Sequence, residues 1–183
     1  MGAISVGKTA IVNRYIYNTF NPLHHLTIGA SYYSSKIKLD TGKEINVNLW
    51  DCAAADGRFN NLMPIFFKNA CVALVVYDVT HVDSFDQSLK LIEFLRQQLD
   101  DVDIVLVGNK IDLDKTITTN VETIANQCGV SFFECSAKTG RGVAELFDFV
   151  HQQIKQRHHQ KPHVDHDHVV LQQDDRTLSC CHL

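Results

Sequence analysis

The first residues of the chain restrict its fold more than any other segment. Residues 2–9 read GAISVGKT and fit the pattern G-x-x-x-x-G-K-[ST]. In a loop of this pattern, glycines let successive backbone N–H groups converge on phosphate oxygens, the lysine reaches the β- and γ-phosphates, and the threonine hydroxyl binds Mg²⁺. A buried strand normally leads into the loop, and the helix that follows adds its positive N-terminal end. The predicted phosphate-binding residues are Gly2, Ser5, Val6, Gly7, Lys8 and Thr9.

The position of this loop is unusual, because it begins one residue after Met1. No apolar stretch precedes the loop that could form the strand from which such a loop starts. We therefore expect a sheet without its first strand, in a chain that starts too late. An alternative is that the sequence comes from a truncated gene model and does not fold stably.

Short apolar segments alternate with helical patterns along most of the chain. Predicted strands cover residues 32–39, 44–50, 71–77, 104–107 and 131–134. Predicted helices cover residues 10–18, 84–99, 121–128 and 143–156. The first two strands flank the turn Asp40-Thr41-Gly42-Lys43 and form a hairpin, whereas the continuous apolar runs are typical of strands buried in a parallel sheet. This order predicts an α/β fold, a mostly parallel, doubly wound sheet with helices on both faces and ligands at the carboxyl ends of its strands.

Composition and charge limit the classes of protein that remain. The 183 residues are 45% hydrophobic, which is enough for one domain with a real core. A net charge of −4 gives no reason to expect a nucleic-acid partner, and no run of about 18 apolar residues predicts a transmembrane helix. The periodic pattern stops near Arg157. We therefore divide the chain into a folded domain, residues 1–156, and a disordered tail, residues 157–183.

A second motif predicts which nucleotide the phosphate loop serves. The apolar run at 104–107 is followed by GNKID, and Asp112 at its end can accept hydrogen bonds from N1–H and the exocyclic amine of guanine. Adenine lacks this pair of donors and would leave the carboxylate unpaired. Other predicted base contacts are the Lys110 stem over the base, a backbone N–H of Ser136-Ala137-Lys138 at guanine O6, and Phe20 at the base edge. With Asn109, these residues predict a guanine-nucleotide site.

The chain resembles the small GTPases and, within them, the Rab family. The resemblance covers residues 2–156 and the two terminal cysteines, and its matching segments are TIG at 27–29, LWD at 49–51, RF at 58–59, VVYDVT at 75–80, SF at 84–85, GNKIDL at 108–113 and ECSAKTG at 134–140. It implies the P-loop NTPase fold of these proteins, GTP or GDP with Mg²⁺ as the ligands, and Thr9, Thr27 and Asp51 as the metal site. Segments near 20–30 and 51–68 would order around the γ-phosphate and be read by effectors.

The chain departs from the family pattern where hydrolysis is carried out. The family reads Trp-Asp-Thr-Ala-Gly-Gln-Glu-Arg-Phe, whereas this chain has one extra residue and places Ala54 and Ala55 where the γ-phosphate glycine and the water-orienting glutamine stand. Ile4 adds a branched side chain beside the γ-phosphate. No catalytic residue is therefore intact, and we expect slow intrinsic GTP hydrolysis. The alternatives are hydrolysis rescued by an activating partner, or a non-hydrolysing scaffold that stays GTP-bound.

The missing strand and the tail complete the comparison with the family. The family places its first strand in the middle of the sheet, so its loss would expose two hydrogen-bonding edges. The ending Ser179-Cys180-Cys181-His182-Leu183 resembles dicysteine prenylation signals, and two lipids at Cys180 and Cys181 would give stable anchoring. The resemblance implies a monomeric switch in vesicle traffic, anchored to the cytosolic face of Golgi or endosomal membranes. Its partners would be effectors, an exchange factor, a GTPase activator and the prenylation escort machinery.

Overall fold

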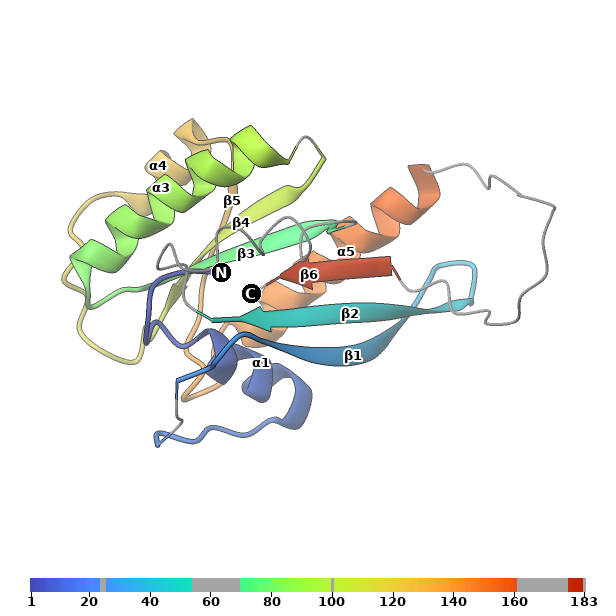
Figure 1. Cartoon of the computed structure of the whole chain (residues 1–183), viewed down its shortest axis with the longest axis horizontal. Coiled ribbons are helices and arrows are strands. Elements are labelled where there is room, and N and C mark those ends of the chain that lie inside the picture. The colour runs from blue at the N-terminus through green and yellow to red at the C-terminus, as the bar shows by residue number, and fades with distance from the viewer. Residues whose placement is uncertain (24–25, 54–69, 100, 161–177, 183) are drawn as a thin grey trace.

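The fold is known from a computed structural model, which describes residues 1–23, 26–53, 70–99, 101–160 and 178–182. Its elements, in chain order, are α1 (Lys8–Tyr17), β1 (Ala30–Lys38), β2 (Glu44–Cys52), β3 (Val72–Asp78), α3 (Val82–Gln98), β4 (Asp103–Asn109), α4 (Val121–Gln127), β5 (Ser131–Glu134), α5 (Val143–Gln160) and β6 (Leu178–His182). Figure 1 shows one sheet with helices on either side. The predicted α/β fold with a mostly parallel sheet is confirmed.

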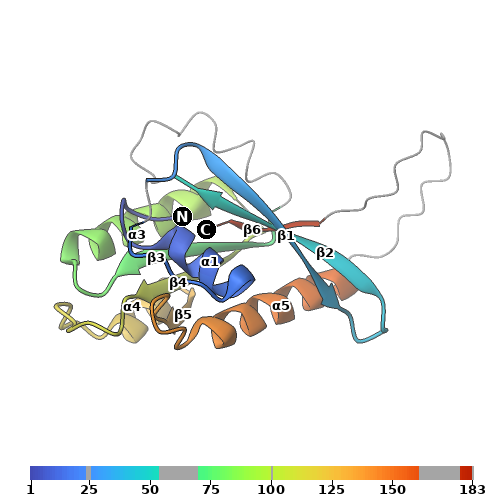
Figure 2. The same cartoon turned by 90° about the horizontal axis from the view of Figure 1, so that it is seen from below.

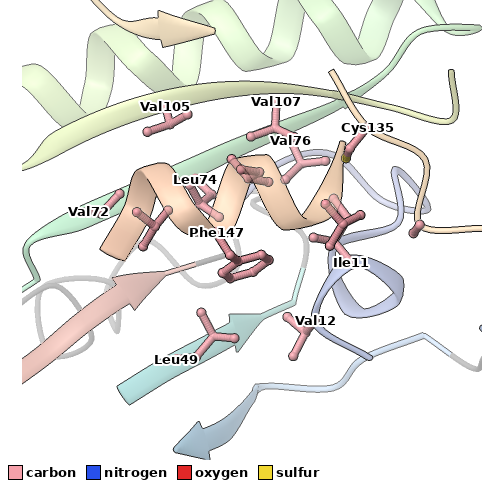
Figure 3. Close-up of a cluster of buried hydrophobic side chains, with 14 of the residues drawn as sticks. Ile11, Val12, Leu49, Val72, Leu74, Val76, Val105, Val107, Cys135 and Phe147 are labelled. Atoms are coloured by element: carbon pink, nitrogen blue, oxygen red, sulfur yellow. The ribbon is translucent and has the colours of Figure 1, made fainter. Parts of the chain in front are cut away.

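The strand β3 organises the hydrophobic core because its side chains alternate between two faces of the sheet. Val72, Leu74 and Val76 belong to a cluster with residues of α1 and α5. Figure 3 shows these three side chains beside Ile11 of α1 and Phe147 of α5. The intervening residues Ala73, Val75 and Tyr77 pack instead in a second cluster, with residues of α3 and α4. Every residue of β3 is buried, which explains the continuous apolar run at residues 72–77.

The strands β1 and β2 form the predicted hairpin at one edge of the sheet. They pair antiparallel over nine residues each, from Ala30 opposite Cys52 to Lys38 opposite Glu44. The turn closes with hydrogen bonds from the Leu39 N–H to the Lys43 carbonyl and from the Gly42 N–H to the Leu39 carbonyl. This hairpin carries Asp51 near the end of β2, at the edge of the sheet where the predicted site lies.

The C-terminal segment forms a strand in the middle of the sheet. The order of the strands is β1-β2-β6-β3-β4-β5, and β6 pairs in parallel with β2 on one side and with β3 on the other. Figures 1 and 2 both show the β6 arrow between these two strands. The prediction of a disordered tail from residue 157 is wrong at both ends, since α5 continues to Gln160 and Leu178–His182 is a strand. The strand forms through long-range pairing, which a short segment without apolar periodicity does not reveal.

The first residues of the chain pair with the sheet through a single isolated bridge and do not form a strand. Among the described residues, none before α1 belongs to a strand, and Gly2 makes an isolated parallel bridge with Val76 of β3. The α-amino group of Met1 donates to the Leu74 carbonyl, and the Met1 carbonyl accepts from the Val76 N–H. These bonds bring the phosphate loop to the carboxyl end of β3. No helix in the described part of the chain has the length and apolar character needed to cross a membrane.

Candidate functional site

The phosphate loop leads into α1, lies against the carboxyl end of β3 and needs glycine at two positions. The backbone of Gly2 has φ +143° and that of Gly7 has φ +95°, both in the region that favours glycine. A Cβ atom at Gly2 would lie 2.1 Å from the Val76 carbonyl oxygen, and one at Gly7 would lie 2.3 Å from Nδ2 of Asn109. Side chains at these positions would push the loop away from the sheet. The glycines therefore hold the loop backbone at the strand ends, where its N–H groups can face an anion.

Lys8 begins α1 and turns its ammonium group back over the loop. The side chain is buried, and Nζ donates to the carbonyl oxygens of Gly2 at 3.1 Å and Ala3 at 2.8 Å. Burial lowers the pKa of Lys8 to about 8, although the nearby charge of Asp51 opposes this change. A bound phosphate beside the ammonium would favour its charged form. The geometry therefore gives the lysine the place that its role in phosphate binding requires.

Three oxygen-bearing side chains meet beside the first turn of α1. The hydroxyl oxygens of Thr9 and Thr27 are 2.7 Å apart, and the Thr9 hydroxyl donates to Oδ2 of Asp51 at 2.5 Å. Asp51 is fully buried at the end of β2. Hydroxyl and carboxylate oxygens are the ligands that Mg²⁺ prefers, usually together with water and substrate phosphates. The residues predicted as the metal site are thus brought together, and their chemistry fits that ion.

Asn109 connects the phosphate loop with the loop that follows β5. This buried side chain donates from Nδ2 to the Val6 carbonyl at 2.8 Å, and its Oδ1 accepts from the Ala137 N–H at 3.1 Å. One amide therefore spans two segments that are far apart in the sequence. Because the N–H groups of Ser136 and Ala137 both have acceptors within the protein, the contact expected between this loop and guanine O6 stays a prediction.

Asp112 is held in a fixed and ionised form. The Ser136 hydroxyl donates to its Oδ1 at 2.6 Å, and the Lys138 ammonium lies 3.6 Å from its Oδ2. The hydrogen bond from Ser136 is the main cause that lowers the pKa of Asp112 below its ordinary value. The side chain is 13% exposed, so it can meet a ligand from one side while its own loop supports it from the other. This arrangement suits a carboxylate that must accept two hydrogen bonds from a base.

Lys110 has a partner that sequence reasoning did not assign. Its backbone is left-handed, with φ +70°, and its ammonium lies 2.6 Å from Oδ2 of Asp78 at the end of β3. Partial burial acts to raise the pKa of Asp78, but hydrogen bonds from Lys110 and Thr80 outweigh this effect and lower the pKa. Asp78 fixes the head of Lys110 and so limits where its apolar stem can lie. Its place in the VVYDVT segment was the available signal.

Arg14 is a second residue that the sequence did not indicate. From α1 it donates through Nε to the Ala137 carbonyl at 2.9 Å and through Nη2 to the Lys138 carbonyl at 2.8 Å. Its third nitrogen bonds to Asn18, which caps the same helix in a left-handed conformation. The planar guanidinium suits two neighbouring carbonyl groups. Arg14 therefore attaches the segment Ser136-Ala137-Lys138, which we call the base loop, to the helix that follows the phosphate loop.

The remaining predicted residues are characterised by their burial or by the element that carries them. Phe20 is partly buried and packs against the core cluster of α1 and α5, while Ile4 is 59% exposed on the phosphate loop. Ala54 and Ala55 lie outside the described residues, so their predicted effect on hydrolysis stays a prediction. Cys180 and Cys181 lie in β6, the central strand.

Comparison with known proteins agrees with this site. The model of the Ras family matches residues 1–156. The chain is also 38% identical, over 151 residues, to the Ras-related protein Rab-21 of Mus musculus, an alignment that covers 80% of this chain and 67% of the relative. Proteins of this family bind GTP or GDP with Mg²⁺ in general, and the phosphate loop, the oxygen cluster and the base loop described above are arranged for such a ligand. The chain therefore belongs to the Rab-family small GTPases of the Ras family.

Proposed function

We propose that this protein is a guanine-nucleotide-dependent switch of membrane traffic, which binds GTP and GDP with Mg²⁺ and hydrolyses GTP slowly. The observation that carries the proposal is the buried Asn109 amide, which bonds to Val6 of the phosphate loop and to Ala137 of the base loop. Its two bonds set the distance between the parts of the site that take the phosphates and the base. A ligand that spans both parts is a nucleotide, and Asp112 selects guanine.

The proposed binding uses the charges already in place. Lys8 and the backbone of the phosphate loop take the β- and γ-phosphates, and the oxygens of Thr9, Thr27 and Asp51 hold Mg²⁺, which neutralises phosphate charge and orients the nucleotide. Thr27 lies between the exposed side chains of Leu26 and Ile28. A change in the position of Thr27 between the GTP and GDP forms would therefore move exposed apolar surface that an effector can read.

Slow hydrolysis follows from the residues near the expected γ-phosphate. In GTP hydrolysis, water attacks the γ-phosphorus, the bond to the β,γ-bridging oxygen breaks, and GDP and phosphate leave. Ala55 has no polar group with which to orient that water, and Ala54 restricts the peptide expected to donate to the γ-phosphate. Ile4 supplies an exposed branched side chain on the loop itself. These three residues weaken catalysis without removing the groups proposed for binding.

A single-turnover assay tests this proposal. Protein loaded with GTP is mixed with Mg²⁺, and phosphate release is compared between the unaltered chain, the double variant Ala54→Gly with Ala55→Gln, and Ile4→Gly. We expect slow release from the unaltered chain and faster release from at least the double variant. Tight GDP and GTP binding, measured on the same samples, serves as the control for folding. Fast unassisted hydrolysis by the unaltered chain would contradict the proposed impairment but not the proposed nucleotide site.

The second candidate is a scaffold that stays GTP-bound and recruits partners constitutively. Exposure of the Ile4 side chain on the phosphate loop favours it, because the same side chain that hinders water would also hinder an activating partner. The two candidates differ in the nucleotide that the purified protein carries. Mostly GDP supports a working switch, and mostly GTP supports the scaffold.

Anchoring to membranes is proposed through the two terminal cysteines. Lipids on Cys180 and Cys181 would hold the protein on the cytosolic face of Golgi or endosomal membranes, because two chains give stable anchoring where one is marginal. A monomer, with an exchange factor, a GTPase activator, effectors and an escort for lipid attachment as partners, completes the proposal. Mass spectrometry of the protein purified from cells tests the anchor, since an unmodified C-terminus would contradict it.

A further inference from the structure

The position between β2 and β3 is shared by the two ends of the described chain. On β3, Val72 pairs with Cys181 and Ala73 with His182 of β6. Two residues farther along β3, the Leu74 carbonyl and the Val76 N–H bond to Met1, and Val76 bridges to Gly2. Both pairings are parallel, so β6 and residues 1–2 run in the same direction along one edge of β3. Figures 1 and 2 show the β6 arrow ending close to the N-terminus.

The gap between β2 and β3, which we call the central lane, is suited to an extended segment. The edge of β2 from Val47 to Trp50 pairs with β6, and so does the beginning of β3. An empty lane would leave both rows of N–H and C=O groups without strand partners in the middle of a sheet, which is costly. A strand added there gains main-chain hydrogen bonds on two sides instead of the one side that an edge position offers.

The strand β6 pairs in the central lane, but its length and its register with β2 are not those of a regular strand. The strand β6 has five residues. Its register with β2 shifts between Asn48 and Leu49, where β6 advances by two residues while β2 advances by one. Cys180 is the extra residue at this bulge, because Ser179 pairs with Asn48 and Cys181 with Leu49. A bulge locally disrupts the ladder. A segment that is short and bulged can be exchanged for a better-fitting strand.

Strand pairing in the central lane and lipid attachment both involve Cys180 and Cys181, but they require the backbone around these residues in different places: in the sheet, or in the active site of the transferring enzyme. Attachment joins the cysteine sulfur to C1 of an allylic prenyl diphosphate, with diphosphate leaving and the thiol proton passing to solvent. An enzyme that catalyses this step must bind the end of the chain in its own active site. It cannot do so while the backbone around Cys180 and Cys181 is paired with β2 and β3.

We propose that the central lane is a strand-acceptor site, that the chain fills it with its own segment Leu178–His182, and that filling it withholds Cys180 and Cys181 from lipid attachment. The last part rests on the anchor proposed above, whereas the first two parts do not. The tail then has two states, one docked in the sheet and one available for modification. A strand that replaces β6 in the lane releases the cysteines.

Hydrogen exchange with a competing strand tests the acceptor site. Because residues 1–2 already run along β3 toward its carboxyl end, five β-forming apolar residues fused ahead of Met1 would enter the lane from its other end and cover the positions of β6. The matched control carries five Gly and Ser residues instead. Exchange is followed by mass spectrometry on the full-length proteins, and retained binding of a fluorescent guanine nucleotide reports folding.

We expect the backbone amides of residues 178–182 to exchange at least about tenfold more slowly than those of an unstructured peptide, in the unaltered chain and in the Gly–Ser control. With the apolar extension they should exchange at the unstructured rate, while Val47–Trp50 and Val72–Ala73 stay protected. A second pair of variants tests the acceptor site without the extension, in case the extended protein misfolds. Ser179→Pro removes a backbone donor within β6 and should abolish the protection of residues 178–182, whereas Ser179→Thr keeps the donor and should keep the protection. Unprotected residues 178–182 in the unaltered chain would overturn the proposal.

Lipid transfer in vitro tests the final part. With a prenyl diphosphate and the transferring enzyme, we expect the apolar extension to raise the initial rate of modification at Cys180 and Cys181 at least about fivefold over the Gly–Ser control. Their C-terminal sequences are identical, so a difference reports access to the tail. Equal rates would overturn the withholding, whereas no modification of any variant would overturn the anchor and leave the exchange result to decide the acceptor site.

Discussion

Replacement of Arg14 gives the sharpest test of how the site is held together. The Arg14 side chain on α1 bonds to the base loop, at the carbonyl oxygens of Ala137 and Lys138. Arg14→Ala removes both bonds. A hydrogen bond to a charged group contributes about 1.5–3 kcal/mol when sheltered, and exposed ones contribute much less. The bond to Ala137 is partly buried and the bond to Lys138 is exposed. We therefore expect Arg14→Ala to remove about 2 kcal/mol of favourable interaction free energy from the two bonds together.

The assay must separate loop positioning from general stability. If most of the lost energy had served to position the base loop, GDP affinity falls roughly tenfold to thirtyfold, since 1.4 kcal/mol corresponds to a factor of ten. Dissociation of a fluorescent GDP analogue measures this change, and thermal unfolding without nucleotide measures stability. Arg14→Lys keeps the charge but not the planar fork, so it should recover only part of the affinity. Reduced stability of Arg14→Ala with unchanged GDP dissociation would refute the positioning role.

Three further predictions concern the two loops. Gly7→Ala places a Cβ 2.3 Å from Nδ2 of Asn109 at φ +95°, so nucleotide binding should fall at least about tenfold in a titration, whereas Gly42→Ala, in the distant hairpin turn with nothing within 4 Å, should leave it unchanged. Asp112→Asn replaces an acceptor by an amide with a donor, so calorimetry should show weakened GDP binding and improved binding of xanthosine diphosphate, whose C2 bears a carbonyl. Because burial lowers the pKa of Lys8 to about 8, GDP affinity should fall as pH rises above about 8, and Lys8→Met should lose this dependence. In the nucleotide-free protein the sign is opposite: the unfolded chain binds the Lys8 proton more tightly than the folded one, so folding stability should gain from Lys8 as pH rises from about 8 toward 10.5.

Much of the fold could be read from local patterns because those patterns reflect burial. The first six residues of β3 are apolar because both faces of the strand are covered, by α1 and α5 on one side and by α3 and α4 on the other. The phosphate loop was recognisable because its two glycines are required by close contacts with Val76 and Asn109. In each case the residue types themselves reflect the burial or the close contact, even where the contacting residue is distant in the sequence.

The connections within the site were less accessible from the sequence. No local pattern identifies Lys110 as the partner of Asp78 or the base loop as the partner of Arg14, because these partners lie 32 and more than 120 residues away. A charged residue at a strand end or in the last turn of a helix is common on any protein surface. Only the folded chain shows which carbonyl or ammonium group it meets.

The order of residues was sufficient to indicate the nucleotide class, the family and the alternation of strands and helices, since each of these depends on a motif or on a local period. How the sheet is completed was not visible, because Leu178–His182 has no apolar period and becomes a strand through pairing with β2 and β3. Hydrogen bonds between backbones depend little on side-chain identity. The occupant of a strand position is therefore set by which segment reaches it in space.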